Sequence, residues 1–148
     1  VYAYSTRGGE DTADLTGLAA GGNYFRGTPF YSTMTDRTRS FYHYARGFHS
    51  VTAAGSKTDP SGDRAYLYDS PGDDTLRGAF LEDGKYQGAS LDDANPSTGT
   101  EASYELLVKY FDLVYARSSD DGTNDSVDIE VEDEDALAYR LIRSGTWT

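Results

Sequence analysis

Alternation of apolar and polar residues runs through three separate parts of the chain. Each part begins with valine and alanine two positions apart, at residues 1–3, 51–53 and 114–116. A polar turn that contains glycine follows, and then a second alternating stretch at 11–15, 63–67 and 125–129. Because successive side chains of a strand point to opposite faces, this period of two predicts half-buried β-strands. The pattern therefore predicts an all-β protein.

The second alternating stretches superpose on one another without gaps. The matched sets are Asp11 with Asp63 and Asp125, Ala13 with Ala65 and Val127, and Leu15 with Leu67 and Ile129. The apolar members are expected to point inward. The residues that lead into the second and third parts also match, since 40–51 align with 103–114. Such self-similarity predicts one domain of repeated units, about 1–50, 51–113 and 114–148.

A parallel β-solenoid is the favoured architecture, because one coil cannot bury its apolar face, whereas coils stacked about 4.8 Å apart can. An antiparallel β-sandwich of hairpins is the alternative. Residues 84–102 are rich in Gly, Pro, Asn and Ser, so they are predicted to form a lateral loop. Residues 101–111 have helical spacing, but their match to the aromatic stretch at 40–48 favours a strand. The third unit is more acidic, as expected of a unit that caps a stack.

Composition narrows the functional classes. The chain has 25 acidic and 13 basic residues and a net charge of −12, which argues against binding nucleic-acid phosphates. Its apolar runs are too short to span a membrane, so membrane insertion is not expected. Cysteine is absent, which excludes disulfides and thiolate metal sites. Because the sequence starts within an alternating stretch, we expect a piece of a longer polypeptide, with a processed mature product as the alternative.

The turn "DSPGDDT" (69–75) is a candidate calcium site. Its carboxylates Asp69, Asp73 and Asp74, with Asp59 or Asp63 as further donors, offer oxygen ligands of the kind that calcium requires. The alternative is a plain turn at 71–72 whose carboxylates accept local hydrogen bonds. The corresponding turn of the first unit, "LAAGGNY" (18–24), has no carboxylate. The sequence thus lacks a stacked second loop to complete a calcium cage.

Motifs for catalysis are missing from the chain. The two histidines, His43 and His49, both lie in the aromatic stretch that precedes the second unit. The sequence contains no nucleophile elbow, zinc-protease motif or phosphate-binding loop. With 25 acidic residues, carboxylate pairs carry little information. The chain is predicted not to be an enzyme; a β-helical polysaccharide lyase or hydrolase is an alternative, since such folds host both activities.

Tyrosine is abundant, with 13 residues in the chain. A predicted interaction surface, at mostly outward positions of the expected strands, comprises Tyr2, Tyr4, Tyr66, Tyr68 and Tyr115. Tyrosine suits association surfaces because it buries a large area at little entropic cost. Glycan-binding surfaces use similar aromatic platforms. The alternative is that these rings pair across strands and stabilise the sheet, at about 0.2–1 kcal/mol per pair.

The middle unit also carries a family resemblance. The residues concerned are Phe48, Val51, Ala53, Gly62, Asp63, Ala65, Tyr66, Leu67, Tyr68, Asp69, Ser70, Gly72, Asp73, Asp74 and Thr75. Their pattern resembles the tandem repeats of very large secreted cell-surface proteins of planctomycete bacteria, which implies an extracellular structural or adhesive setting. Over a shorter stretch, "GDDTLRG" (72–78) is similar to half of a calcium-binding nonapeptide repeat of secreted toxins.

Together these features predict an extracellular, cell-surface repeat protein with a structural role. It would form a fibre, sheath, surface layer or adhesin stalk by self-assembly through β-stacking. Its expected partners are copies of itself or neighbouring repeats. The alternative is a calcium-stabilised module that binds surface polysaccharide.

Overall fold

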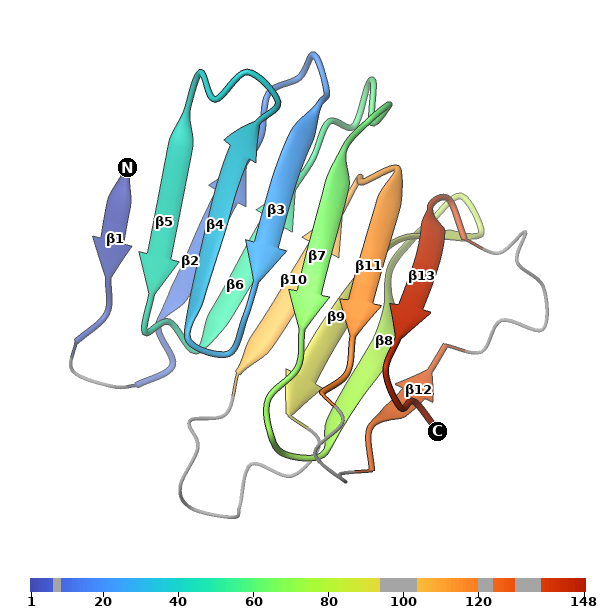
Figure 1. The fold of residues 1–148 in the computed structure, drawn as a ribbon. Coiled ribbons are helices and arrows are strands. Elements are labelled where there is room, and N and C mark those ends of the chain that lie inside the picture. The colour runs from blue at the N-terminus through green and yellow to red at the C-terminus, as the bar shows by residue number, and fades with distance from the viewer. Residues whose placement is uncertain (7–8, 94–103, 120–123, 130–136) are drawn as a thin grey trace.

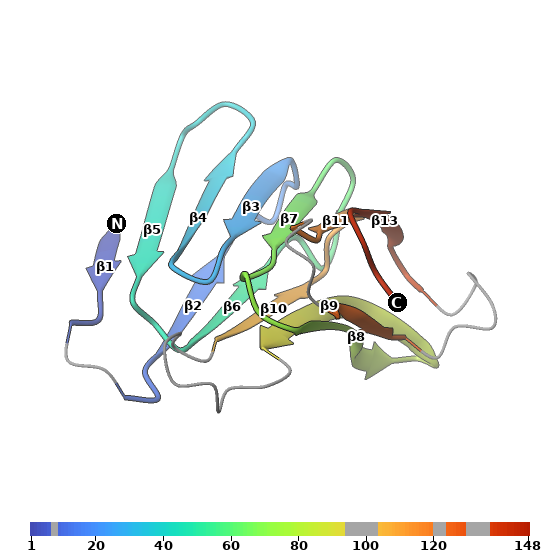
Figure 2. The same ribbon diagram turned by 60° about the horizontal axis from the view of Figure 1, so that its bottom comes forward.

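A computed structural model describes residues 1–6, 9–93, 104–119, 124–129 and 137–148. All regular elements in these ranges are β-strands, arranged in two mixed sheets that face each other (Figures 1 and 2). The all-β prediction is therefore confirmed. The described residues contain no helix, and so none with the length and apolar character needed to cross a membrane.

Sheets A and B take up alternate parts of the chain. Sheet A has the order β1-β5-β4-β3-β7-β11-β13 and sheet B the order β12-β8-β9-β10-β6-β2. The bounds are β1 Tyr2–Tyr4, β2 Thr12–Thr16, β3 Asn23–Gly27, β4 Tyr31–Asp36, β5 Tyr42–Arg46, β6 Ser50–Ala54, β7 Arg64–Tyr68, β8 Asp74–Glu82, β9 Lys85–Asp93, β10 Glu105–Lys109, β11 Leu113–Arg117, β12 Ser126–Asp128 and β13 Arg140–Ser144. The alternating stretches at 11–15, 63–67 and 125–129 correspond to β2, β7 and β12.

The path of the chain turns each predicted unit over relative to the one before. The first unit runs from β1 in sheet A to β2 in sheet B and returns to sheet A for β3, β4 and β5. The second unit starts in sheet B with β6, crosses to sheet A for β7, and returns to sheet B for β8, β9 and β10. The third starts again in sheet A with β11. Matched strands therefore lie in opposite sheets in successive units.

Pairing combines features of both predicted architectures. Strand β6 lies between β2 and β10 and is parallel to both, and β7 lies in the same way between β3 and β11. These parallel ladders are typical of stacked coils. By contrast, β3-β4-β5 and β8-β9-β10 are antiparallel meanders of the kind found in sandwiches. The two sheets are consequently mixed.

The predicted lateral loop at 84–102 is wrong for its first half. Residues 85–93 form β9, which pairs with β8 through a tight hairpin at Asp83-Gly84. Both turn residues have positive φ, 52° and 74°, as a two-residue type I′ turn requires, and Asp-Gly is a preferred pair for it. The rest of the predicted loop, 94–102, lies outside the described residues. The strand expected within 101–111 is confirmed by β10.

The core lies between the sheets and uses the predicted inward residues. Ala65 and Leu67 of β7 are fully buried, as are Ala53 of β6 and Val114 of β11. Phe25, Met34, Leu76, Leu91 and Val108 complete its centre. At the ends of the sheets the same pattern is less buried. Val127 and Ile129 are half-buried, and Val1 is 77% exposed.

Candidate functional site

A buried carboxylate organises the first corner, where the first two units meet. Asp63 lies just before β7 and opposite Asn23, the first residue of β3. It accepts the backbone N–H of Asn23 at 2.7 Å, the side-chain amide of Asn23 at 3.0 Å and the N–H of Ser56 at 2.6 Å. The Asn23 amide oxygen in turn accepts the N–H of Leu18 at 2.7 Å. The first corner therefore pairs one carboxylate with an amide.

The second corner repeats this geometry with different groups. Asp125, the match of Asp63, accepts the backbone N–H of Asp74 at 3.1 Å and the hydroxyl of Ser118. Asp74 begins β8 as Asn23 begins β3, so a carboxyl group replaces the amide. It accepts the N–H and hydroxyl of Ser70, both at 2.9 Å, and the hydroxyl of Tyr104 at 2.7 Å.

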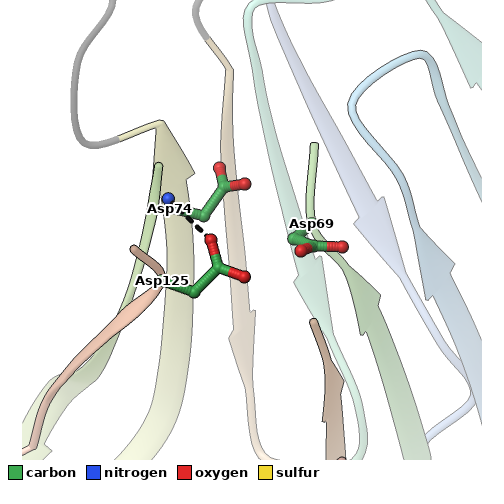
Figure 3. Close-up of side chains that lie close together, drawn as sticks. All are labelled: Asp69, Asp74 and Asp125. Atoms are coloured by element: carbon green, nitrogen blue, oxygen red, sulfur yellow. Dashed lines mark hydrogen bonds between the residues drawn. The ribbon is translucent and has the colours of Figure 1, made fainter. Parts of the chain in front are cut away.

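A third carboxylate completes the second corner. Asp69 directly follows β7, and its Oδ2 accepts the N–H of Ser119 at 2.6 Å and the Ser119 hydroxyl at 3.1 Å. Figure 3 shows Asp69 and Asp74, which lie at the two ends of the turn between β7 and β8, together with Asp125, which precedes β12. One oxygen of each lies within 4.8 Å of one oxygen of the others.

Glycine holds the position of Asp69 in the first corner. Gly17 and Asp69 each follow the strand that precedes the turn, and each donates its N–H to the carbonyl that ends the neighbouring strand, at 2.9 and 3.2 Å. A Cβ on Gly17 would lie 2.4 Å from Cγ of Asn23. The first corner thus has no room for an acidic side chain at position 17.

Burial and like charge raise the proton affinity of the second corner. Burial raises the pKa of Asp74 to about 7, against the hydrogen bonds from Tyr104 and Ser70, and the Asp69 charge adds to the rise. Burial also raises the pKa of Asp69 to about 6, with a further contribution from Asp125. A carboxyl group with such a pKa can hold a proton near neutral pH. Asp69 and Asp74 can then hold protons instead of carrying two like charges side by side.

The predicted metal ligands are only partly brought together. Asp69 and Asp74 meet, but Asp73 lies apart, and its Oδ1 accepts the N–H of Asn124 at 2.9 Å. Asp63 belongs to the first corner, and Asp59 accepts the N–H of Ser61 at the surface. The missed member is Asp125, whose match to Asp63 was the signal that it lies at a corner.

Calcium and protons place different demands on this group. A calcium ion takes six to eight oxygens. Both oxygens of Asp74 already accept hydrogen bonds, and so does Oδ2 of Asp69. A cavity of about 580 Å³ opens beside Asp69, and Arg117 is among the residues that line it. This arrangement favours a shared proton, while calcium binding stays a prediction.

All five predicted tyrosines belong to strands of sheet A. Tyr66 and Tyr115 stack with ring centroids 4.8 Å apart and planes at 1°. Tyr2 and Tyr4 contact Tyr44 with centroids 5.9 and 5.8 Å apart. The guanidinium of Arg26 lies over Tyr68 at 4.8 Å and over Tyr31 at 5.8 Å. We call this set of Tyr2, Tyr4, Tyr31, Tyr44, Tyr66, Tyr68, Tyr115 and Arg26 the tyrosine face.

Whether a matched position carries tyrosine depends on the sheet in which it lies and not on its place in the predicted unit. Tyr2 of β1 and Tyr115 of β11 lie in sheet A, whereas the matched residue of β6 in sheet B is Thr52. Likewise Tyr66 lies in sheet A, and its matches in sheet B are Asp14 and Asp128. Since units alternate between sheets, a uniform repeat would place tyrosine on both outer surfaces. The outer surface of sheet A is therefore chemically distinct.

Comparisons with known proteins do not assign the chain to a family. No family model, curated protein or solved structure matches it. The resemblance to planctomycete surface repeats stays a prediction. Function has to be inferred from the geometry of this chain alone.

Proposed function

We propose that the chain is a structural unit that builds an extended assembly by β-stacking. The observation that carries this proposal is the position of the outermost strands. Sheet A ends in β1 and β13, and sheet B ends in β2 and β12, so both ends of the two-layer stack present strand edges (Figure 1). Exposed strand edges are templates for pairing with further strands.

The parallel ladders support the same role. Strands β2, β6 and β10 run parallel in sheet B, and β3, β7, β11 and β13 run parallel in sheet A. Such ladders can continue beyond either end in the same direction. In this proposal the protein is a solenoid-like stack with a hairpin added to each complete coil. It would serve in a fibre, sheath, surface layer or adhesin stalk, and the resemblance of residues 48–75 to secreted surface repeats supports an extracellular setting for this role.

Sedimentation velocity and electron microscopy over a concentration series would test this proposal, each with and without a calcium chelator. We expect assemblies that grow with protein concentration and persist in chelator, because backbone ladders and side-chain contacts hold them. Assemblies that dissolve on chelation would instead assign the second corner to calcium. Monomers at every concentration would contradict a self-assembling role.

A second candidate function is polysaccharide binding by the tyrosine face. It is favoured by the gathering of the seven tyrosines of the tyrosine face on the outer surface of sheet A, which sheet stability alone does not require. Binding to insoluble cell-surface polysaccharides would be measured for the wild type and for Tyr66→Thr with Tyr115→Thr. If the tyrosine face binds glycan, the double variant loses retention while Thr52→Ala, on sheet B, keeps it. Equal retention of all three proteins would contradict this candidate.

A further inference from the structure

One edge of β12 already pairs with a residue outside sheet B, namely Thr148. Thr148 donates its N–H to the carbonyl of Asp125 at 2.8 Å and accepts the N–H of Val127 at 3.0 Å. These bonds place Thr148 beside Ser126, on the side of β12 away from β8. In a strand the N–H and C=O of one residue point to the same side. The C=O of Val127 and the N–H of Ile129 therefore face the same edge as Thr148.

The same type of hydrogen bond stands at the start of two strands within the chain, β6 and β11. Ser50 donates its N–H to the carbonyl of Asp11, and Leu113 to that of Asp63, each at 3.2 Å. Asp11 and Asp63 are the matches of Asp125. From Ser50 the chain continues as β6 alongside β2, and from Leu113 it continues as β11 alongside β7. The edge of β12 at Val127 and Ile129 thus has the geometry with which β2 receives β6 and β7 receives β11.

Strand β1 has the sequence and the free edge that this position requires. Residues 1–3 share the valine–alanine spacing of 51–53 in β6 and 114–116 in β11. In the described structure β6 and β11 each pair on two sides, whereas β1 pairs only with β5. The carbonyl of Val1 accepts the N–H of Tyr44, and the N–H of Ser5 bonds to Arg46, both at 2.9 Å. The backbone groups of Tyr2 consequently point away from β5.

An apolar groove lies beside the same edge. It has a volume of about 340 Å³ and is lined by Val127, Ile129, Leu137, Tyr139, Arg140, Leu141 and Arg143. In the middle of the molecule, inward residues of neighbouring strands such as Ala65, Leu67 and Val114 are buried in the core. At the opposite end of the stack Ala3 and Ala13 are half-buried, and Leu15 is 9% exposed. The two ends offer apolar surfaces of matching position.

The charges of the two ends are complementary, and Asp11 occupies the position that Asp63 and Asp125 hold at the corners. Strand β13 carries Arg140 and Arg143 and no acidic residue, whereas β2 carries Asp14 and follows Asp11. Asp63 and Asp125 are buried and accept an N–H from the first residue of β3 or β8. Asp11 is exposed and accepts the hydroxyl of Ser5 at 2.5 Å. Continuing the register of the ladders places Asp11 of a second copy opposite Tyr139.

We propose that a second copy of this chain docks head to tail on this end, with its β1 on β12 and its β2 on β13. In this register Val1 of the second copy lies beside Val127, and Tyr2 beside Asp128. Sheet A of the second copy then continues sheet B of the first, as each unit is turned over within the chain. This docking rests on the proposed self-assembly and specifies its contact.

Disulfide trapping tests the register directly, because the chain has no cysteine. Tyr2→Cys and Asp128→Cys are prepared as separate proteins, mixed under mild oxidation and analysed for the mixed dimer. Directly paired strands hold their Cα atoms about 4.8 Å apart, within the range that a disulfide spans. We expect a mixed dimer from this pair at least tenfold more abundant than from Tyr4→Cys with Asp128→Cys, which is two residues out of register. Equal yields from the two pairs would overturn the proposal.

A backbone variant tests the edge without depending on oxidation. Tyr2→Pro removes an N–H that points away from β5, a place where edge strands tolerate proline. The matched control is Tyr2→Thr, which keeps the N–H and copies Thr52 of β6. Sedimentation velocity is expected to show association weakened at least tenfold by Tyr2→Pro and nearly unchanged by Tyr2→Thr. Assemblies that form equally with Tyr2→Pro would refute this docking but leave self-assembly standing, whereas a wild type that stays monomeric would refute both.

Discussion

The first and second corners share one backbone contact, in which a buried aspartate accepts the N–H of the residue that begins β3 or β8. They differ in the side chains around this contact. In the first corner, the carboxylate of Asp63 meets the amide of Asn23, and Gly17 leaves space for that amide. In the second corner, Asp125 meets Asp74, and Asp69 stands in the place of the glycine. An amide can donate a hydrogen bond to a carboxylate, whereas a second carboxylate can do so only when it is protonated. The fold therefore needs a carboxylate that accepts the backbone N–H at each corner, but it does not need the additional acids Asp69 and Asp74.

This difference gives the first corner a structural role and makes the second corner sensitive to pH as well. The first corner satisfies buried donors with a single charge. The second corner keeps the backbone contact from Asp74 to Asp125 at 3.1 Å and adds two carboxyl groups whose pKa values are raised to about 7 and about 6. The protonation of Asp69 and Asp74 changes near neutral pH, so the stability of the second corner is expected to respond to pH in that range.

The largest effect is expected from removing the carboxylate of the first corner. Asp63→Ala leaves the N–H of Asn23, its side-chain amide and the N–H of Ser56 without their acceptor. Each unsatisfied buried donor costs about 1–3 kcal/mol, so we expect a loss of about 4 kcal/mol in the free energy of unfolding. Urea unfolding at pH 7.5 provides the measurement. Asp125→Ala is the matched variant, with a smaller loss because it also relieves repulsion; equal losses would contradict the comparison.

Converting the first corner into the second is expected to cost somewhat less. Asn23→Asp replaces the amide that donates to Asp63 at 3.0 Å with a second carboxylate in a buried position. An uncompensated buried charge costs about 3 kcal/mol. Stability should therefore fall by about this amount at pH 8 and recover as the new carboxyl group is protonated at lower pH. A variant as stable as the wild type at pH 8 would show that the amide is not needed.

Much of the fold could be predicted because its middle strands alternate strictly. In β7 the inward residues are Ala65 and Leu67, both fully buried, between outward tyrosines and arginine. Strand β4 was missed because its core side carries Ser32, Met34 and Asp36, which do not form an apolar alternation. The alternation of units between sheets was also missed. It depends on the crossing connections and is not encoded in any single strand.

The site could be predicted only where its residues are close in sequence. Asp69 and Asp74 belong to one turn, and their proximity follows from it. Asp125 reaches them through the pairing of β12 with β8, a contact between distant segments. The correspondence of Asn23 with Asp74 was hidden because the loops that precede them differ in length. Asp73 was included since its position beside Asp74 could not show that it points elsewhere.

A smaller effect, of opposite sign, is expected from converting the second corner into the first. The folded-state pKa of Asp74 is raised to about 7 from an ordinary value of 3.8. Between these values the folded protein keeps a proton that the unfolded chain has lost, so the free energy of unfolding falls as pH rises from about 4 to 7 and then levels off. The slope for one group is at most about 1.4 kcal/mol per pH unit.

Asp74→Asn removes this titration and should flatten the profile, with a gain of about 1–2 kcal/mol at pH 8. Urea unfolding of both proteins from pH 4 to pH 8 measures the difference. The matched control is Asp73→Asn, because Asp73 lies outside the cluster and its substitution should change stability by less than about 0.5 kcal/mol. A wild-type profile that stays level between pH 4 and 7, or a control that flattens it equally, would contradict a proton held at Asp74.

The smallest effect is expected from calcium, and it separates a proton-sharing corner from a metal site. At pH 8 the carboxyl groups of Asp69 and Asp74 are mostly ionised, which is the most favourable condition for a cation. Calcium at 10 mM with a dissociation constant of about 0.1–1 mM, typical of extracellular modules, would raise the free energy of unfolding by about 1.4–2.7 kcal/mol. We expect no shift beyond that of magnesium at equal concentration, because both Asp74 oxygens accept hydrogen bonds and Arg117 lines the adjoining cavity. A calcium-specific rise that Asp74→Asn abolishes would instead make the second corner a metal site, and the first corner its metal-free counterpart.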